Sequence, residues 1–203
     1  MPALFAISPG RGDADELRAR IPGLARGGVA DFLLREKSST GASRRRIARV
    51  IAPVCREWGL RLWISDDREL AREVAAQGVH LGEAAGPAEG PGLYGLSLHR
   101  GSLRTQPERI GAHHCFFGPV FATPSKEGTL EPIGLDPFLQ ARVSLEGGPT
   151  VYALGGVVRA RLPELASAGV REVAGIRLFF GPEDPEQVAR ESLAVLAEVS
   201  PCP

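Results

Sequence analysis

Charged and hydroxyl side chains follow several short apolar runs in this sequence. Arg35 and Lys37 follow one run, Ser65 and Asp66 close another, and His99 ends a third. Guanidinium and ammonium groups bind phosphoryl oxygens, and a single carboxylate can hold magnesium together with the oxygens of a diphosphate. The pattern therefore predicts a site for a phosphorylated small molecule, provided that the runs end at the same edge of the fold.

Two further segments look suited to an anion. Gly155 and Gly156 follow an apolar run, and adjacent glycines allow a ligand to approach the backbone and the free N–H groups of a following helix. Thr123, Ser125 and Lys126 place two hydroxyl groups and an ammonium within four residues. A glycine pair alone also suits an ordinary turn, but the two segments and the cations named above together favour phosphate binding.

The acidic and histidine residues of this region have competing interpretations. Asp66 is predicted to bind magnesium, whereas Asp67 suits the N-cap of the helix that SDDREL begins. His80 and His99 fit either a hydrogen-bonded structural role or acid–base catalysis, and the pair at 113–114 is predicted to be structural. The sequence contains no zinc-type Cys/His spacing, no nucleophile elbow and no Walker loop.

The elements that must position these residues alternate between apolar and amphipathic stretches. Strands are predicted at residues 3–8, 31–35, 61–65, 78–81, 93–99, 113–120, 150–154 and 172–180. Helices are predicted at residues 13–26, 43–58, 67–77, 103–110, 136–145, 159–168 and 185–199. Strands that are apolar on both faces and separated by helices call for a parallel sheet, and eight such units favour a compact TIM (β/α)₈ barrel. An open doubly wound sheet is the alternative, although no GxGxxG follows the first strand.

Composition limits the class of protein. The 203 residues are 43% hydrophobic and 24% charged, with 24 basic and 24 acidic side chains. This balance indicates one globular domain over residues 1–203, disfavours a disordered chain or a general nucleic-acid binder, and leaves no run suited to a membrane helix. No signal peptide is evident, and Cys55, Cys115 and Cys202 are interpreted as reduced thiols of a cytoplasmic protein. Arg44–Arg46 is interpreted as a solvated helix face.

An ordered set of motifs resembles the thiamine phosphate synthase and TenI superfamily. These motifs are LLREK (33–37), ISDDRELA (64–71), GVHLGE (78–83), GLSLH (95–99), FGPVFATPSKEG (117–128), TLEPIGLDPF (129–138), ALGGV (153–157) and VAGIRLFFG (173–181). Synthases of this superfamily are TIM barrels that join a hydroxymethylpyrimidine diphosphate to a thiazole phosphate with magnesium and release diphosphate.

The resemblance implies roles for individual residues. Arg35, Lys37 and Lys126 would hold the diphosphate, Asp66 would bind magnesium, and Ser97 would contact the pyrimidine. The thiazole phosphate would be held by Thr123, Ser125, Gly155 and Gly156. The candidate catalytic residues are Lys37, Lys126 and His99.

The sequence also departs from the family pattern. Leu33 stands in place of a glutamine and Ser65 in place of an asparagine. Ala85 replaces a second magnesium aspartate, which leaves Asp66 as the predicted metal ligand and Glu83, two residues away, as the alternative second carboxylate. Arg177 replaces a small residue beside the second phosphate, where it would either bind that phosphate or fill its site.

Three interpretations remain open. The favoured one is a synthase-like transferase, with full or weakened activity. The second is a TenI-like thiazole tautomerase, although Pro119 stands where tautomerases carry a histidine, so His99 or His80 would have to move the proton. The third is a non-catalytic barrel that binds thiazole or thiamine phosphate. Small phosphorylated molecules are the expected partners in each case, and a homodimer is the expected assembly of a small barrel.

Overall fold

A computed structural model describes residues 1–83, 92–99, 111–123 and 131–198 of the chain. Within these ranges no helix combines the length and the apolar character needed to cross a bilayer. The predictions for a helix at 103–110 and for Ala85, Ser125, Lys126 and Cys202 concern residues outside the described ranges.

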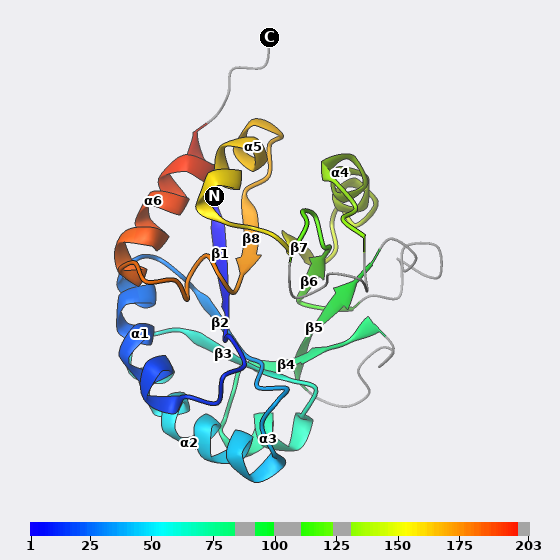
Figure 1. Cartoon of the computed structure of the whole chain (residues 1–203). Coiled ribbons are helices and arrows are strands. Elements are labelled where there is room, and N and C mark those ends of the chain that lie inside the picture. Colours follow the sequence, from blue (N-terminus) through cyan, green and yellow to red (C-terminus); the bar gives the residue numbers. More distant parts are fainter. Residues whose placement is uncertain (84–91, 100–110, 124–130, 199–203) are drawn as a thin grey trace.

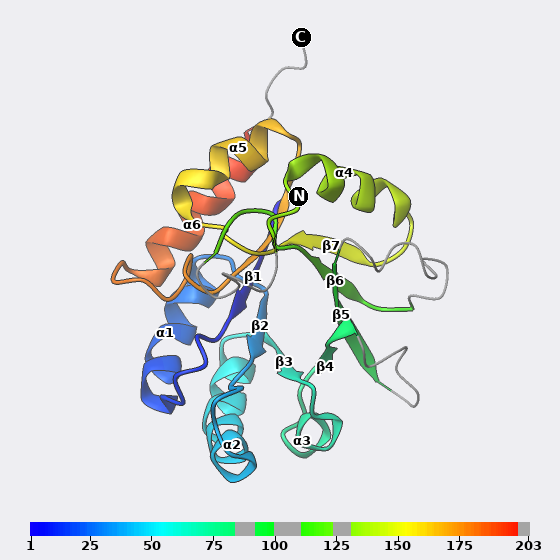
Figure 2. The ribbon, with the colours of Figure 1, turned by 45° about the vertical axis from the view of Figure 1, so that its right-hand side comes forward.

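Eight parallel strands form a closed barrel in sequence order, as the alternating pattern predicts (Figures 1 and 2). The strands are β1 Ala3–Ile7, β2 Asp31–Leu34, β3 Arg61–Ser65, β4 Gly78–Leu81, β5 Leu93–Leu98, β6 His114–Phe117, β7 Thr150–Ala153 and β8 Glu172–Gly175. Closure is made by β1 and β8, where Ala3 pairs with Glu172 and Ala6 pairs with Gly175. The carboxyl ends of all the strands therefore surround one mouth.

The described helices lie on the outer face of the barrel (Figures 1 and 2). They are α1 Ala14–Arg26, α2 Gly41–Glu57, α3 Arg68–Glu73, α4 Leu135–Ser144, the 3₁₀ helix η5 Arg159–Arg161, α5 Leu162–Ser167 and α6 Pro185–Ala197. Side-chain oxygens cap several of these helices: Asp13 caps α1, Thr40 caps α2 and Asp184 caps α6. The caps fix where each loop at the mouth ends and its helix begins.

Strand residues point alternately to two separate apolar cores. The larger core lies between the sheet and the helices, and it includes Phe32, Phe117 and Phe138. The smaller core fills the barrel interior, where the rings of Phe5 and Phe116 meet edge to face at a centroid distance of 4.9 Å. The interior is thus packed below the mouth, and the mouth is the part of the barrel left to bind a ligand.

The structure corrects several predicted boundaries. The strand predicted at 172–180 ends at Gly175, because residues 176–180 turn back and the N–H of Phe180 donates to the carbonyl of Ile176. The strand predicted at 113–120 ends at Phe117, before the cis peptide bond that joins Gly118 to Pro119. Residues 118–120 and 178–180 are buried, so apolar character alone did not distinguish strand from buried loop.

Candidate functional site

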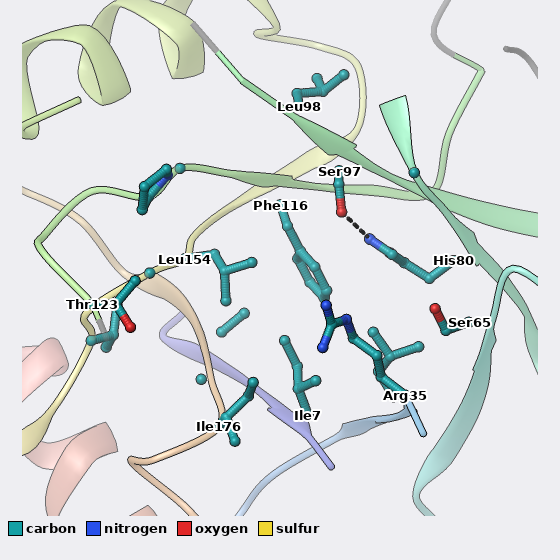
Figure 3. Close-up of a pocket in the computed structure, with 18 of the residues that line it drawn as sticks. Ile7, Arg35, Ser65, His80, Ser97, Leu98, Phe116, Thr123, Leu154 and Ile176 are labelled. Atoms are coloured by element: carbon teal, nitrogen blue, oxygen red, sulfur yellow. Dashed lines mark hydrogen bonds between the residues drawn. The ribbon is translucent and has the colours of Figure 1, made fainter. Parts of the chain in front are cut away.

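A cavity of about 330 Å³ opens at the carboxyl ends of the strands. It is lined by residues from, or directly following, every strand of the barrel: Ile7, Leu33, Arg35, Lys37, Ser65, Asp66, His80, Gly82, Glu83, Ser97, Leu98, His99, Phe116, Gly118, Pro119, Thr123, Leu154, Gly155, Gly156, Val157, Ala174, Gly175, Ile176 and Arg177. Figure 3 shows Arg35 and Ser65 on one side of the cavity and Thr123 on the opposite side. Its size is within the range of small-molecule sites.

The loop after β2 supplies the two cations of one wall, Arg35 and Lys37. The backbone N–H of Arg35 donates to the buried hydroxyl of Ser8, which follows β1, at 2.8 Å. Glu36, between the two cations, is buried and points to the first loop, where it accepts the N–H of Gly12 at 2.7 Å. Anchoring Glu36 in this way leaves the cations on either side of it at the cavity.

Asp66 and Asp67 have different positions, and Asp67 caps the following helix as the sequence predicts. The carboxylate of Asp67 accepts the N–H of Leu70 at 2.8 Å and caps α3. Asp66 instead has a left-handed backbone with φ 57° and lies at the cavity. Aspartate tolerates this conformation better than most residues, and such backbone strain concentrates at functional sites.

The carboxylate of Asp66 is oriented by two neighbours. Its Oδ1 accepts the N–H of Gly82 at 3.0 Å, and its Oδ2 accepts the hydroxyl of Ser65 at 2.9 Å. Glu83 lines the same cavity. Magnesium commonly takes one or two carboxylates and completes its shell with water and phosphate oxygens. Within the described ranges no cluster of three or more His, Cys, Asp or Glu residues suits a metal.

The loops after β6 and β7 form the opposite wall. Gly155 and Gly156 have φ values of 92° and 67°, and the loops are joined by the N–H of Phe121, which donates to Gly155 O at 3.0 Å. A Cβ atom on Gly156 would lie 2.6 Å from the carbonyl oxygen of Ala122. The glycines thus permit both a left-handed backbone and a close approach between two loops.

The expectation that a helix N-terminus follows the glycines needs a correction. The next helical residues are the three of η5, which begin only at Arg159. The backbone of Gly155, Gly156 and Val157, rather than the first turn of a helix, lines the cavity.

Two polar side chains stand beside this glycine wall. Arg177 follows β8, and its Nη2 donates to the hydroxyl of Thr123 at 3.5 Å. Both side chains line the cavity. A hydroxyl, a guanidinium and exposed backbone together suit a phosphate group.

The cavity has an apolar floor that the sequence analysis did not identify. It consists of Ile7, Leu33, Phe116, Leu154 and Ile176. Figure 3 shows four of them, Ile7, Phe116, Leu154 and Ile176, between Thr123 and Arg35. Each of these residues lies at a position of its strand, or just after it, whose side chain points into the barrel. The alternation of side chains along a strand could predict these positions once the barrel register is known. An apolar floor suits an aromatic ring.

The histidines at the mouth differ in their contacts. His99 Nδ1 donates to the carbonyl oxygen of Gly118 at 2.6 Å. His80 is buried in the barrel, and its Nε2 lies 2.9 Å from the hydroxyl of Ser97 (Figure 3). Both histidines line the cavity, so both remain candidates to act on a ligand.

Ten predicted site residues that the structure describes line this one cavity. They are Arg35, Lys37, Ser65, Asp66, Ser97, His99, Thr123, Gly155, Gly156 and Arg177. They come from loops and strand ends far apart in the sequence.

Comparisons with known proteins show the family of this chain. Residues 4–179 match the family described as thiamine monophosphate synthase. The thiamine-phosphate synthase of Bordetella pertussis is 34% identical over 205 residues, which cover 96% of this chain and 94% of that protein. The thiamine-phosphate synthase of Thioalkalivibrio sulfidiphilus is 34% identical over 206 residues, which cover 97% of this chain and 95% of that protein.

A solved structure shares the fold. Thiamine phosphate pyrophosphorylase from Pyrococcus furiosus superposes with a TM-score of 0.73 at 22% identity, covering 96% of this chain and 95% of that one. Sequence and fold thus point the same way, and the match extends over almost the whole chain. The chain belongs to the thiamine monophosphate synthase family of transferases in thiamine biosynthesis.

Proposed function

We propose that this protein joins a hydroxymethylpyrimidine diphosphate to a thiazole phosphate, forming thiamine phosphate and releasing diphosphate. The observation that carries the proposal is the division of one cavity into a cationic wall with a carboxylate, an apolar floor and a glycine-lined wall. This division matches a substrate pair with a diphosphate, two aromatic rings and a second phosphate.

The cationic wall would stabilise the leaving diphosphate. Departure of diphosphate from the pyrimidine methylene breaks a C–O bond and concentrates negative charge on the leaving oxygens. Burial lowers the pKa of Arg35, and the charges of Asp66 and Glu36 oppose this shift. A guanidinium remains protonated at neutral pH, so Arg35 would present a permanent positive charge from a partly buried position.

Asp66 would bind the magnesium ion that accompanies the diphosphate. When bound, magnesium neutralises negative charge on the diphosphate oxygens. The two hydrogen bonds to Asp66 hold its carboxylate in one orientation at the cavity before any ligand binds. Glu83 lines the cavity nearby and is the second candidate donor.

The apolar floor would hold the pyrimidine and exclude water from it. A dissociative departure leaves a pyrimidine-methyl cation, and water would capture this cation in competition with the thiazole nitrogen. Leu33 and Phe116 are each almost fully buried in the floor. Ser97, at the edge of the floor, would hydrogen-bond the pyrimidine.

The glycine wall would bind the thiazole phosphate. Thr123 lies across the cavity from Arg35 (Figure 3), Arg177 donates to its hydroxyl, and Gly155 and Gly156 line the same cavity. This separation would direct the two phosphorylated ends to opposite walls and leave the two rings facing each other over the floor. The thiazole nitrogen would then be placed to form the new C–N bond with the cation once the C–O bond has broken.

The test is an assay with purified protein, pyrimidine diphosphate, thiazole phosphate and magnesium. We expect thiamine phosphate and diphosphate in equal amounts, with formation stopped by a chelator and restored by added magnesium. Failure to form product at high protein concentration would reject the proposal. Conversion of a thiazole carboxylate phosphate isomer without the pyrimidine would support the tautomerase instead.

A further inference from the structure

A chain of buried polar groups leads from the cavity into the barrel. The hydroxyl of Ser97 lies 2.9 Å from His80 Nε2, and His80 Nδ1 lies 3.0 Å from His114 Nε2. The other nitrogen of His114, Nδ1, lies 3.4 Å from Nδ1 of His113, which is half-buried just before β6. Four side chains from β4, β5 and the start of β6 thus form one continuous series.

Gly95 makes the central link of this series possible. In the barrel, His80 pairs with Gly95 on β5, and Gly95 pairs with His114 on β6. The two histidines are therefore two strands apart, on either side of a glycine. A Cβ atom on Gly95 would overlap the ring of His114. The missing side chain lets the His114 ring reach across β5 to His80.

The surroundings of His114 are almost entirely aromatic. Its ring centroid lies 4.5 Å from that of Trp63, 4.8 Å from that of Phe5 and 5.1 Å from that of Phe116. Desolvation lowers the pKa of His114 to about 2, and His80, His113 and Arg61 add to the shift. The ring is thus neutral at physiological pH.

His80 is neutral for a similar reason. His80 is 4% exposed, and its ring stacks on that of Phe116 with centroids 4.2 Å apart. Burial against an aromatic ring favours the neutral form of the imidazole. A neutral imidazole carries one N–H and one acceptor nitrogen, so each buried histidine can donate on one side only and must accept on the other.

This restriction allows only two arrangements that satisfy every bond. In the first, Ser97 donates to His80 Nε2, His80 Nδ1–H donates to His114, and His114 Nδ1–H donates to His113. In the second, every donor is reversed: His113 donates to His114, His114 Nε2–H donates to His80, and His80 Nε2–H donates to Ser97. Both histidines carry Nδ1–H in the first arrangement and Nε2–H in the second.

We propose that His80 and His114 are positioning residues that share one tautomer and thereby set whether the Ser97 hydroxyl accepts or donates in the cavity. In the first arrangement Ser97 presents lone pairs to a ligand. In the second it presents its O–H. Neither arrangement leaves a buried nitrogen without a partner, so Ser97 can bind either a donor or an acceptor group of a ligand at little cost in free energy.

Interconversion keeps the proton count of the series constant. Going from the first arrangement to the second, Ser97 passes its proton to His80, His80 passes one to His114, and His114 passes one to His113. His113 releases its Nε2 proton to solvent, and Ser97 takes a proton from water in the cavity. No bond other than O–H and N–H bonds is formed or broken.

The proposal gives the series a use in substrate recognition, and this part rests on the proposed function. An aminopyrimidine offers both acceptor ring nitrogens and a donor amino group, so a hydroxyl that can take either role fits this class of ring. The shared tautomer itself does not depend on turnover.

Nitrogen-15 NMR of the histidine rings tests the proposal directly, because the chain has only four histidines. Single substitutions at each histidine assign the signals. We expect His80 and His114 to be neutral between about pH 5 and 8 and to show the same tautomer. When pyrimidine diphosphate and magnesium are added, we expect the tautomers of His80 and His114 either both to stay unchanged or both to convert together. Opposite tautomers, conversion of one ring alone, or protonation of either ring in this range would overturn the proposal.

Variants separate the relay from simple packing. His114→Phe keeps an aromatic ring in an aromatic site but removes the hydrogen bond to His80. We expect the tautomer of His80 to change or to become mixed in this variant. We also expect KM for the pyrimidine diphosphate to rise up to about tenfold, with less change in kcat. Gly95→Ala should separate the two rings and give the same change at His80. Cys115→Ala is the matched control, because Cys115 is buried on the opposite face of β6 and should leave the His80 signal unchanged. An unchanged His80 signal in His114→Phe would contradict the proposal.

If the protein proves to have no synthase activity, the tautomer measurements still apply, with the pyrimidine diphosphate serving only as a probe. Failure of the proposed function and failure of the shared tautomer are thus distinguishable.

Discussion

Adjacent aspartates illustrate how a single backbone angle assigns a role to a residue. Asp66 has a positive φ and its carboxylate lies at the cavity, whereas the extended Asp67 caps a helix. Both residues have the same chemistry and nearly the same sequence context. The difference in role arises from the change in chain direction at the end of β3.

This difference yields the first prediction. Asp66→Asn should lower thiamine phosphate formation by at least about 100-fold, because the amide keeps the shape but loses the charge that binds magnesium. Rates over a range of magnesium concentrations measure the loss. Asp67→Asn is the matched control, since asparagine also caps helices, and it should keep most of the activity. Equal losses in both variants would argue against the metal role of Asp66.

Leu33 carries the second prediction. Its side chain is 1% exposed and forms part of the apolar floor. Leu33→Gln should lower KM for the pyrimidine diphosphate several-fold by adding an amide beside the ring, at a stability cost of about 1–3 kcal/mol for burying that amide. Leu33→Met supplies the apolar control of similar volume. If the glutamine variant bound the pyrimidine no better than the methionine variant, the ring would not lie against this residue.

Side-chain identity predicted which polar residues reach the cavity, but not the hydrogen bonds between them. Arg35, Lys37 and Asp66 were found because a charged side chain that ends a buried run has to face solvent or a ligand. His114 was interpreted only as structural, because its partner His80 lies two strands away. Letters alone do not show that Gly95 opens the space between them.

Among the elements, the loops after β6 and β7 depend most on particular glycines. Gly156 has φ 67° and lies against Ala122, whereas Gly147 has φ 79° with open space around its Cα. Comparing Gly156 with Gly147 therefore separates the free-energy cost of a left-handed backbone from the cost of a steric clash.

The third prediction compares these two glycines. Gly147→Ala should destabilise the fold by about 1–2 kcal/mol, the cost of a left-handed alanine. Gly156→Ala should cost at least about 1 kcal/mol more, because its new methyl group also meets the neighbouring loop. Urea unfolding measures both values. Equal costs would mean that the two loops are not packed as described.

Strand starts were easier to predict than strand ends. All eight predicted strands begin within one residue of the observed start, because an apolar run follows a turn there. Ends were less accurate at β6 and β8, where buried loop residues continue the apolar pattern. The mouth of a barrel is lined by such loops. Hydrophobic periodicity is therefore least informative about secondary structure in the region that carries the site.

For the whole molecule, the two buried histidines make stability depend on pH. The pKa values of His80 and His114 in the folded state, about 3 and about 2, lie below the value near 6.5 expected in the unfolded chain. The unfolded chain therefore binds more protons at mildly acidic pH, and acid favours unfolding. Stability is fully present above about pH 6.5 and is lost as the pH falls toward about 3.

The fourth prediction gives this effect a size. Each histidine should remove about 1.4 kcal/mol of unfolding free energy per pH unit below about pH 6. Urea unfolding at several pH values measures the slope. His114→Phe should reduce the slope by about one histidine's share, which separates this contribution from that of the carboxylates. An unchanged slope in that variant would mean that His114 is not protonated on unfolding.

Closure of the barrel has a consequence for synthesis of the protein. The first strand completes its pairing only with the last, from Ala3 to Glu172. A nascent chain on the ribosome therefore cannot close the ring until nearly all of it has been translated. Catalytic competence should appear late and abruptly, and C-terminal truncations before Gly175 should yield no partial enzyme.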